Sequence, residues 1–168
     1  MNRLETINTL PIEIAQLLGN DIQLQQLLIE DDNRLSKENF QKLNLNDLLK
    51  NEYISFTPVV DNNITNNSRN TFLIINLEEI NFENRNDNAS VTGAIFVGTD
   101  KQHAVLSENR LRLLEIILRI YNLLDNYKFS ISGIVNINYA TFVSFSEYVF
   151  GYKIVFNVTE QEVRKAEI

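Results

Sequence analysis

The chain has 168 residues, of which 44% are hydrophobic and 22% charged, and this length and composition predict a single globular domain. It contains no cysteine, which excludes disulfide bonds and metal sites built on thiolates. The formal net charge of −7 argues against a general nucleic-acid-binding protein, because such a protein presents a basic face to its ligand.

The first segment with a clear pattern is 3–18, where apolar residues recur at helical spacing. Proline is tolerated only in the first turn of a helix, so Pro11 predicts a helix that begins near residue 10 with Thr9 as its cap. Gly19 follows the last apolar residue and is expected to end this helix.

Two further helices are predicted before the pattern changes. Asp21 is a candidate N-cap for a short helix over 22–29, and a third helix is expected within 36–51. From residue 53 onward, β-branched and aromatic residues begin to alternate with polar ones, which indicates strands.

Five strands are predicted in the rest of the chain, and polar segments at 61–70 and 83–90 separate the first three. The alternation is clearest in the last strand, where six apolar side chains are expected to share one face of a sheet. The strands are expected over 53–60, 71–82, 91–98, 130–138 and 148–159. The six side chains are those of Tyr148, Phe150, Tyr152, Ile154, Phe156 and Val158.

The segment 107–127 predicts a long helix around which the other elements are arranged. Ser107 is its candidate N-cap, and no glycine or proline interrupts the apolar residues that follow. Polar residues form only one narrow stripe along this helix, so we expect a sheet and a second helix to cover the remaining circumference.

This order of elements predicts an α+β fold with a mainly antiparallel sheet, one long central helix, and N-terminal helices packed on one face. Residues 1–168 are expected to form one domain. Within it, 1–51 is a helical N-terminal region, 53–159 is an α+β sandwich core, and 160–168 is a charged tail.

The sequence offers little for catalysis or metal binding. The single histidine, His103, lies in a polar link without the partners of a hydrolase triad, and one histidine cannot make a zinc site. The acidic run at 30–32 lacks the spacing of a calcium loop, and the adjacent Glu78 and Glu79 point to opposite faces of a strand. We therefore expect no enzymatic activity, no cofactor and no metal.

Three charged residues of the central helix, Arg112, Glu115 and Arg119, follow one another at spacings of three and four. They are interpreted as a solvent-exposed stripe with weak intrahelical ion pairs, or as a stripe that meets acidic groups of a neighbouring subunit. Either interpretation places them on the surface.

The segment 140–147 is predicted to be a loop between the last two strands, yet it carries Phe142, Val143 and Phe145. Such a loop either folds back onto its own core or presents apolar side chains to a partner. Together with Arg112, Glu115 and Arg119, these residues are the candidate oligomer or partner interface.

The N-terminus lacks the apolar core and cleavage site of a signal peptide, and no segment has the roughly 20 apolar residues of a spanning helix. The sequence therefore predicts a soluble protein made in the cytoplasm, without a membrane partner.

The order of elements over 53–159, and the final strand FGYKIVFNVT at 150–159, resemble the tail-terminator (tail-completion) and neck-ring proteins of tailed bacteriophages. The N-terminal third is longer and more helical than that pattern. The resemblance implies a non-enzymatic virion protein, made in the host cytoplasm, that forms a homo-oligomeric ring at the neck or tail end. Its partners would be its own copies, neighbouring neck or tail proteins, and DNA that passes through without sequence-specific binding.

Two other hypotheses come from different functional classes. The first is a monomeric protein-binding module that acts through a sheet edge or through the segment 140–147. The second is an enzyme that uses carboxylates alone, which stabilisation by Mg²⁺ or Ca²⁺ would support.

Overall fold

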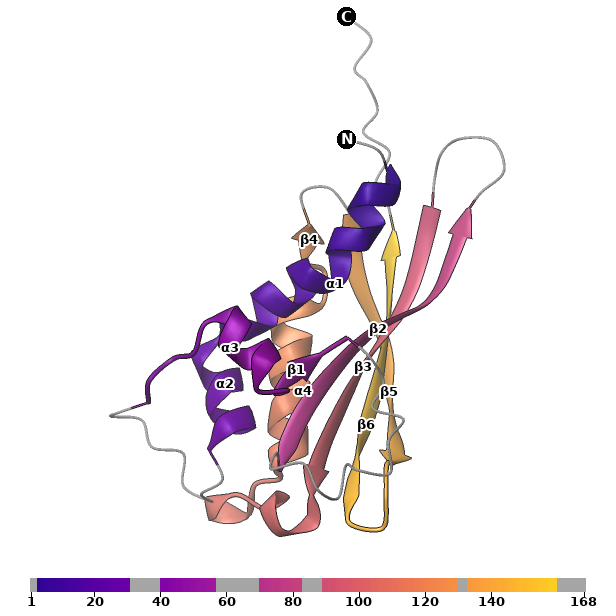
Figure 1. Cartoon of the computed structure of the whole chain (residues 1–168). Coiled ribbons are helices and arrows are strands. Elements are labelled where there is room, and N and C mark those ends of the chain that lie inside the picture. Colours follow the sequence, from indigo (N-terminus) through magenta and orange to yellow (C-terminus); the bar gives the residue numbers. More distant parts are fainter. Residues whose placement is uncertain (1–2, 31–39, 57–69, 83–88, 130–132, 160–168) are drawn as a thin grey trace, which may run out of the picture.

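A computed structural model of the chain describes residues 3–30, 40–56, 70–82, 89–129 and 133–159 (Figure 1). It has an α+β fold in which six strands form one sheet in the order β1-β2-β3-β6-β5-β4. The strands are β1 (Ile54–Ser55), β2 (Thr71–Phe82), β3 (Ala89–Asp100), β4 (Lys128–Phe129), β5 (Gly133–Ser144) and β6 (Val149–Thr159). The helices are α1 (Arg3–Gly19), α2 (Ile22–Ile29), α3 (Leu45–Lys50) and α4 (Arg112–Leu124), with the short 3₁₀ helices η2 (Lys101–His103) and η3 (Ser107–Asn109).

The sheet is mainly antiparallel, as the sequence predicted. Strands β2 and β3 form one hairpin and β5 and β6 form another, and the two hairpins join where β3 pairs with β6. Among the strands of the described residues, β1 alone runs parallel to its neighbour, β2. Sequence neighbours that are joined by short connections pair antiparallel, because a parallel pair needs a longer crossover.

The helices gather on one side of the sheet in Figure 1. Helices α1 and α2 pack on β2, whereas α4 packs on β3, β5 and β6. The main hydrophobic core fills the space between these layers. Five of the six last-strand side chains predicted to share a face, from Phe150 to Val158, belong to this core or pack against it, which confirms the alternation.

The prediction of one long central helix is wrong. Helix α4 has 13 residues, fewer than the 17 of α1, and it begins at Arg112. Ser107 lies in η3 instead of capping α4, because Asn109 takes a left-handed conformation with φ of 58° that no α-helix continues through. Asn126, with φ of 60°, likewise follows the end of the helix.

Other predicted boundaries also change. Helix α1 begins at Arg3 and contains Pro11, so Thr9 is not its cap, whereas Gly19 does end the helix. Asp21 caps α2 as predicted, and its side chain accepts a hydrogen bond of 2.8 Å from the N–H of Leu24. The third helix, predicted within 36–51, is observed only as α3, and the first strand, predicted over 53–60, is observed only as β1. Parts of both predicted ranges, 36–39 and 57–60, lie outside the described residues.

A second, smaller apolar cluster lies on the face of the sheet opposite the helices. Phe72, Ile74 and Val149 are its buried members, and Phe96 and Phe145 pack against them. The Phe72 and Phe145 rings meet edge to face with centroids 5.3 Å apart. Both faces of the sheet therefore carry packed apolar residues.

Candidate functional site

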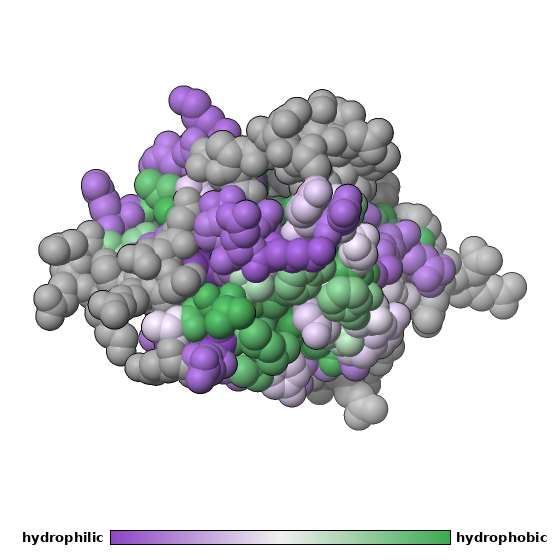
Figure 2. Space-filling model, turned by 90° about the horizontal axis from the view of Figure 1, so that it is seen from below, coloured by the Kyte–Doolittle hydropathy of each residue, from purple (hydrophilic) through white to green (hydrophobic). Residues whose placement is uncertain are grey.

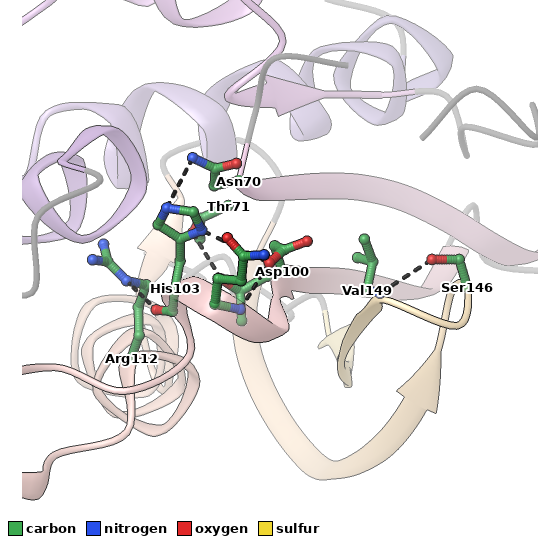
Figure 3. Close-up of polar contacts among 9 residues, drawn as sticks. Asn70, Thr71, Asp100, His103, Arg112, Ser146 and Val149 are labelled. Carbon is green, nitrogen blue, oxygen red and sulfur yellow. Dashed lines mark hydrogen bonds and ion pairs between the residues drawn. The ribbon is translucent and has the colours of Figure 1, made fainter. Parts of the chain in front are cut away.

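The three charged residues of α4 do not form one exposed stripe. Arg112 is only 1% exposed, which overturns its assignment to the surface. Its Nε donates to the carbonyl oxygen of His103 at 2.9 Å (Figure 3), and its Nη1 donates to that of Leu27 at 2.7 Å. Leu27 is in the last turn of α2, where free carbonyls and the helix dipole favour a cation. Arg112 thus joins α2 and η2 to α4.

Arg119, two turns further along α4, also contacts α2. Its Nε donates to Oδ1 of Asp21 at 2.8 Å, and its Nη2 pairs with Oδ2 of the same carboxylate. Burial alone would raise the pKa of Asp21, but hydrogen bonds from Arg119 and from the N–H of Leu24 outweigh it, so the pKa lies below its usual value. Hydrogen bonding to Asp21 raises the pKa of Arg119 in turn.

This ion pair predicts an acid-sensitive contribution to stability. Because the pKa of Asp21 is lower in the folded chain, the contribution is complete above the unfolded value of about 3.8 and is lost as pH falls through the folded value. Asp21→Asn keeps an N-cap but removes the charge, and we expect it to lower the free energy of unfolding at pH 7 by about 1 kcal/mol. Urea unfolding should show the difference from wild type shrinking below pH 4, whereas a constant difference would contradict the prediction.

The third charged residue, Glu115, stays near the surface. Its Oε1 lies 3.5 Å from Nη1 of Arg110, at the N-terminal side of α4. The three residues therefore share no partner, and two of the three, Arg112 and Arg119, fix α2 against α4.

His103 occupies a partly buried position at the end of the molecule that contains η2. Its Nε2 lies 3.2 Å from Nδ2 of Asn70, and its Nδ1 lies 3.9 Å from Oδ1 of Asp100 (Figure 3). In the part of the chain that the structure describes, no three His, Asp or Glu side chains gather into a group that could hold a metal ion. Of the acidic run at 30–32, the last two residues lie outside that part.

The segment 140–147 is not a loop, which is a correction to the prediction. Strand β5 continues to Ser144 and pairs with β6 over its whole length, and only the tight turn that follows is irregular. Phe145 folds back: its ring lies 5.3 Å from that of Phe72 and 6.4 Å from that of Phe96. Val143 lies on the face of the sheet opposite the helices, as Phe145 does, and is half-buried.

Phe142 has a different position. It lies on the helix side of the sheet, near the rings of Phe150 and Tyr152, yet 59% of it is exposed. Beyond Ile137 the outer edge of β5 has no strand beside it among the described residues, because β4 pairs only with its first two residues. The residues Tyr139–Ser144 are uncharged and mostly exposed. A strand edge of this kind is a template for pairing with another chain.

A row of apolar side chains on α4 is also exposed, although the sequence predicted that it would be covered. Leu114, Leu118 and Tyr121 are each more than 40% exposed and stand at helical spacing. They lie roughly opposite Arg112 and Arg119 around the helix, and hence on the side turned away from α2. Helix α4 itself contacts β5, towards the opposite side of the sheet from β2, on which α2 packs.

Figure 2 views the molecule from the end that contains η2, η3 and the β5–β6 turn. Apolar residues form a green area across this end, and purple, hydrophilic residues border it. Val105 and Leu111, just before α4, are exposed apolar residues of this part of the chain. A separate set of exposed apolar side chains belongs to α4 and to the open edge of β5, namely Leu114, Leu118, Tyr121 and Phe142, and we call this set the α4–β5 surface.

A scan against family models finds no match for this sequence, and no curated protein matches it. Among the helices in the described residues, none combines the length and the hydrophobicity needed to cross a bilayer.

Proposed function

We propose that this chain is a non-catalytic structural subunit that assembles with further copies of itself into a ring. The observation that carries the proposal is the α4–β5 surface, which combines an uncharged open strand edge on β5 with exposed leucine, tyrosine and phenylalanine side chains. Exposed edges that also carry apolar side chains are typical of interaction sites.

The resemblance to tail-terminator and neck-ring proteins suggests where such a ring would act. There it would sit at the neck or tail end of a tailed bacteriophage, contact neighbouring virion proteins, and let DNA pass. An acidic subunit suits a passage of this kind, because a wall with a net charge of −7 per copy does not bind the phosphate backbone.

Light scattering coupled to gel filtration, followed by negative-stain imaging, tests the proposal. We expect closed rings at micromolar concentrations, and more ring at higher salt because screening weakens the repulsion between acidic copies. Phe142→Lys should shift the protein toward monomer, whereas Val105→Lys, a change at another exposed apolar residue, should not. A strict monomer that also fails to bind virion components would contradict the proposal.

The alternative is a monomeric module that pairs its β5 edge with an extended segment of another protein. The open edge serves this function equally well, since strand addition needs only unpaired backbone groups. Pull-down experiments separate the two functions: a module would capture one partner in a fixed ratio and remain monomeric without it.

A further inference from the structure

The sheet has a second open edge, at its opposite end. Strand β1 pairs only with Leu73 and Ile74 of β2, so the second half of β2 has no strand on its outer side among the described residues. Residues 78–81 there are exposed, and Ile80 is an apolar side chain that is 38% exposed. The two open edges belong to β2 and β5, the outermost long strands.

The backbone hydrogen bonds establish which residues of β5 present free groups. The N–H groups of Val135 and Ile137 donate away from β6, to Tyr127 and Asp125. These two residues lie opposite even-numbered residues of β6, and Ala140, Phe142 and Ser144 do so too. In an antiparallel ladder, every second pair has no hydrogen bonds within it, and the backbone N–H and C=O groups of its residues point away from the partner strand. Ala140, Phe142 and Ser144 belong to such pairs, as Val135 and Ile137 do, so they present their backbone groups to the open edge.

The same argument applies to β2. The N–H of Leu73 donates to the carbonyl of Tyr53, away from β3, and Leu73 lies opposite Val97. Ile80 lies opposite Val91, which is an even number of residues away from Val97 along β3. The pair is therefore of the same kind as Leu73–Val97, and the backbone groups of Ile80 also point away from β3. Ile80 and Phe142 lie on the helix side of the sheet, because Val91 and Tyr152 opposite them belong to or pack against the main core.

We propose that the β5 edge of one copy pairs antiparallel with the β2 edge of the next, with Phe142 opposite Ile80. This inference rests on the proposed ring function and specifies its interface. Strands β2 and β5 run in opposite directions within one copy, so the junction continues the antiparallel order with every copy's helices on the same side. Two different surfaces meet, and such head-to-tail contacts close into rings or extend into filaments.

Charge and size both fit this pairing. The acidic copies repel one another, but Ala140–Ser144 carry no charge, and Glu78 on the β2 side is already paired with Lys153 at 2.6 Å. Phe142 and Ile80 are exposed apolar side chains that would cover each other on one face. Thr141 and Asn81 would then be opposite each other on the other face, as a pair without hydrogen bonds between them.

The register also sets an offset between copies. Within one copy, Phe142 pairs with Tyr152, Tyr152 with Val97, and Val97 with Leu73, so Phe142 and Leu73 lie at the same position along the strand direction. At the junction, Phe142 would instead lie beside Ile80 of the next copy. At about 3.3 Å per residue, each copy is displaced along the strands by roughly 20 Å relative to its neighbour. A sheet that closes on itself needs a stagger of this kind.

Disulfide cross-linking tests the pairing directly, because the chain has no cysteine of its own. The Cα atoms of an antiparallel pair without hydrogen bonds lie about 4.5 Å apart, which a disulfide can bridge. We expect the double variant Thr141→Cys, Asn81→Cys to form a ladder of linked oligomers under mild oxidation. Each single variant alone should remain unlinked, and an equal mixture of the two singles should give linked dimers.

The cross-linking results and the images of the particles together separate a failure of the β5–β2 pairing from a failure of the proposed ring. Rings that form without the Thr141–Asn81 cross-link would overturn the pairing and leave the ring function standing. A dimer from Thr141→Cys alone would show that β5 pairs with β5 of a second copy, and a link from Thr141→Cys to Glu79→Cys instead would show another register; either result overturns the inference. A linked ladder that images as filaments supports the pairing and contradicts the ring.

Discussion

Replacing Arg112 by alanine is expected to lower the free energy of unfolding by about 3–5 kcal/mol. The change removes a side chain that is only 1% exposed and leaves a cavity between α2 and α4. It also leaves the carbonyls of Leu27 and His103 without the donors that they have at 2.7 and 2.9 Å. Urea unfolding followed by circular dichroism measures the effect.

Two further variants separate the causes. Arg112→Met retains most of the volume but supplies no donor, so we expect it to recover only the part of the loss that comes from the cavity. Arg110→Ala removes a neighbouring guanidinium whose side chain is 44% exposed, and it should change stability by less than about 0.5 kcal/mol. A loss below about 1 kcal/mol for Arg112→Ala would contradict the structural role assigned here.

The second large effect is expected for Gly151→Ala. Gly151 lies opposite Gly98, near the Asp100–Val149 end of the β3–β6 pair, and a Cβ there would overlap the carbonyl oxygen of Val97. That oxygen belongs to the backbone of a central strand and cannot move without breaking the ladder. We expect a loss of about 3 kcal/mol or more in the free energy of unfolding, together with faster hydrogen exchange in β3.

Gly19→Ala is the matched control for this change. A Cβ at Gly19 would come no closer than 3.1 Å to a side-chain atom of Leu48, which can move slightly. Gly19 is also the last residue of α1, where alanine is a good helix former, so the change in stability should stay within about 1 kcal/mol. If Gly151→Ala were as mild as Gly19→Ala, the close approach of β3 and β6 would be wrong.

Local patterns in the sequence predicted those parts of the fold that depend on local chemistry. The cap at Asp21, the end of α1 at Gly19 and the alternation in β6 each follow from a few neighbouring residues, and all three are confirmed. The antiparallel sheet followed from the short connections between its strands. These features need no knowledge of distant contacts.

The candidate site was harder to predict, because it depends on contacts between distant segments. Arg112 and Arg119 do lie on one side of their helix, but nothing local shows that α2 would cover that side. Strand β5 has a bulge between Ile137 and Tyr139, which shifts the alternation of its side chains between the two faces by one residue. The sequence pattern therefore did not indicate that the strand continues to Ser144. The short α4 follows from the left-handed Asn109, which the sequence does not reveal.

The joining of two hairpins through β3 and β6 has a consequence for how the chain folds. Each hairpin closes a short stretch of chain and can form early, whereas the pairs from Asp100–Val149 to Val91–Val158 close a loop that includes all of α4. Non-local strand pairing of this kind slows folding. The meeting of β3 with β6 is therefore expected to be the rate-limiting event, and until it occurs each hairpin exposes a long unpaired edge to aggregation.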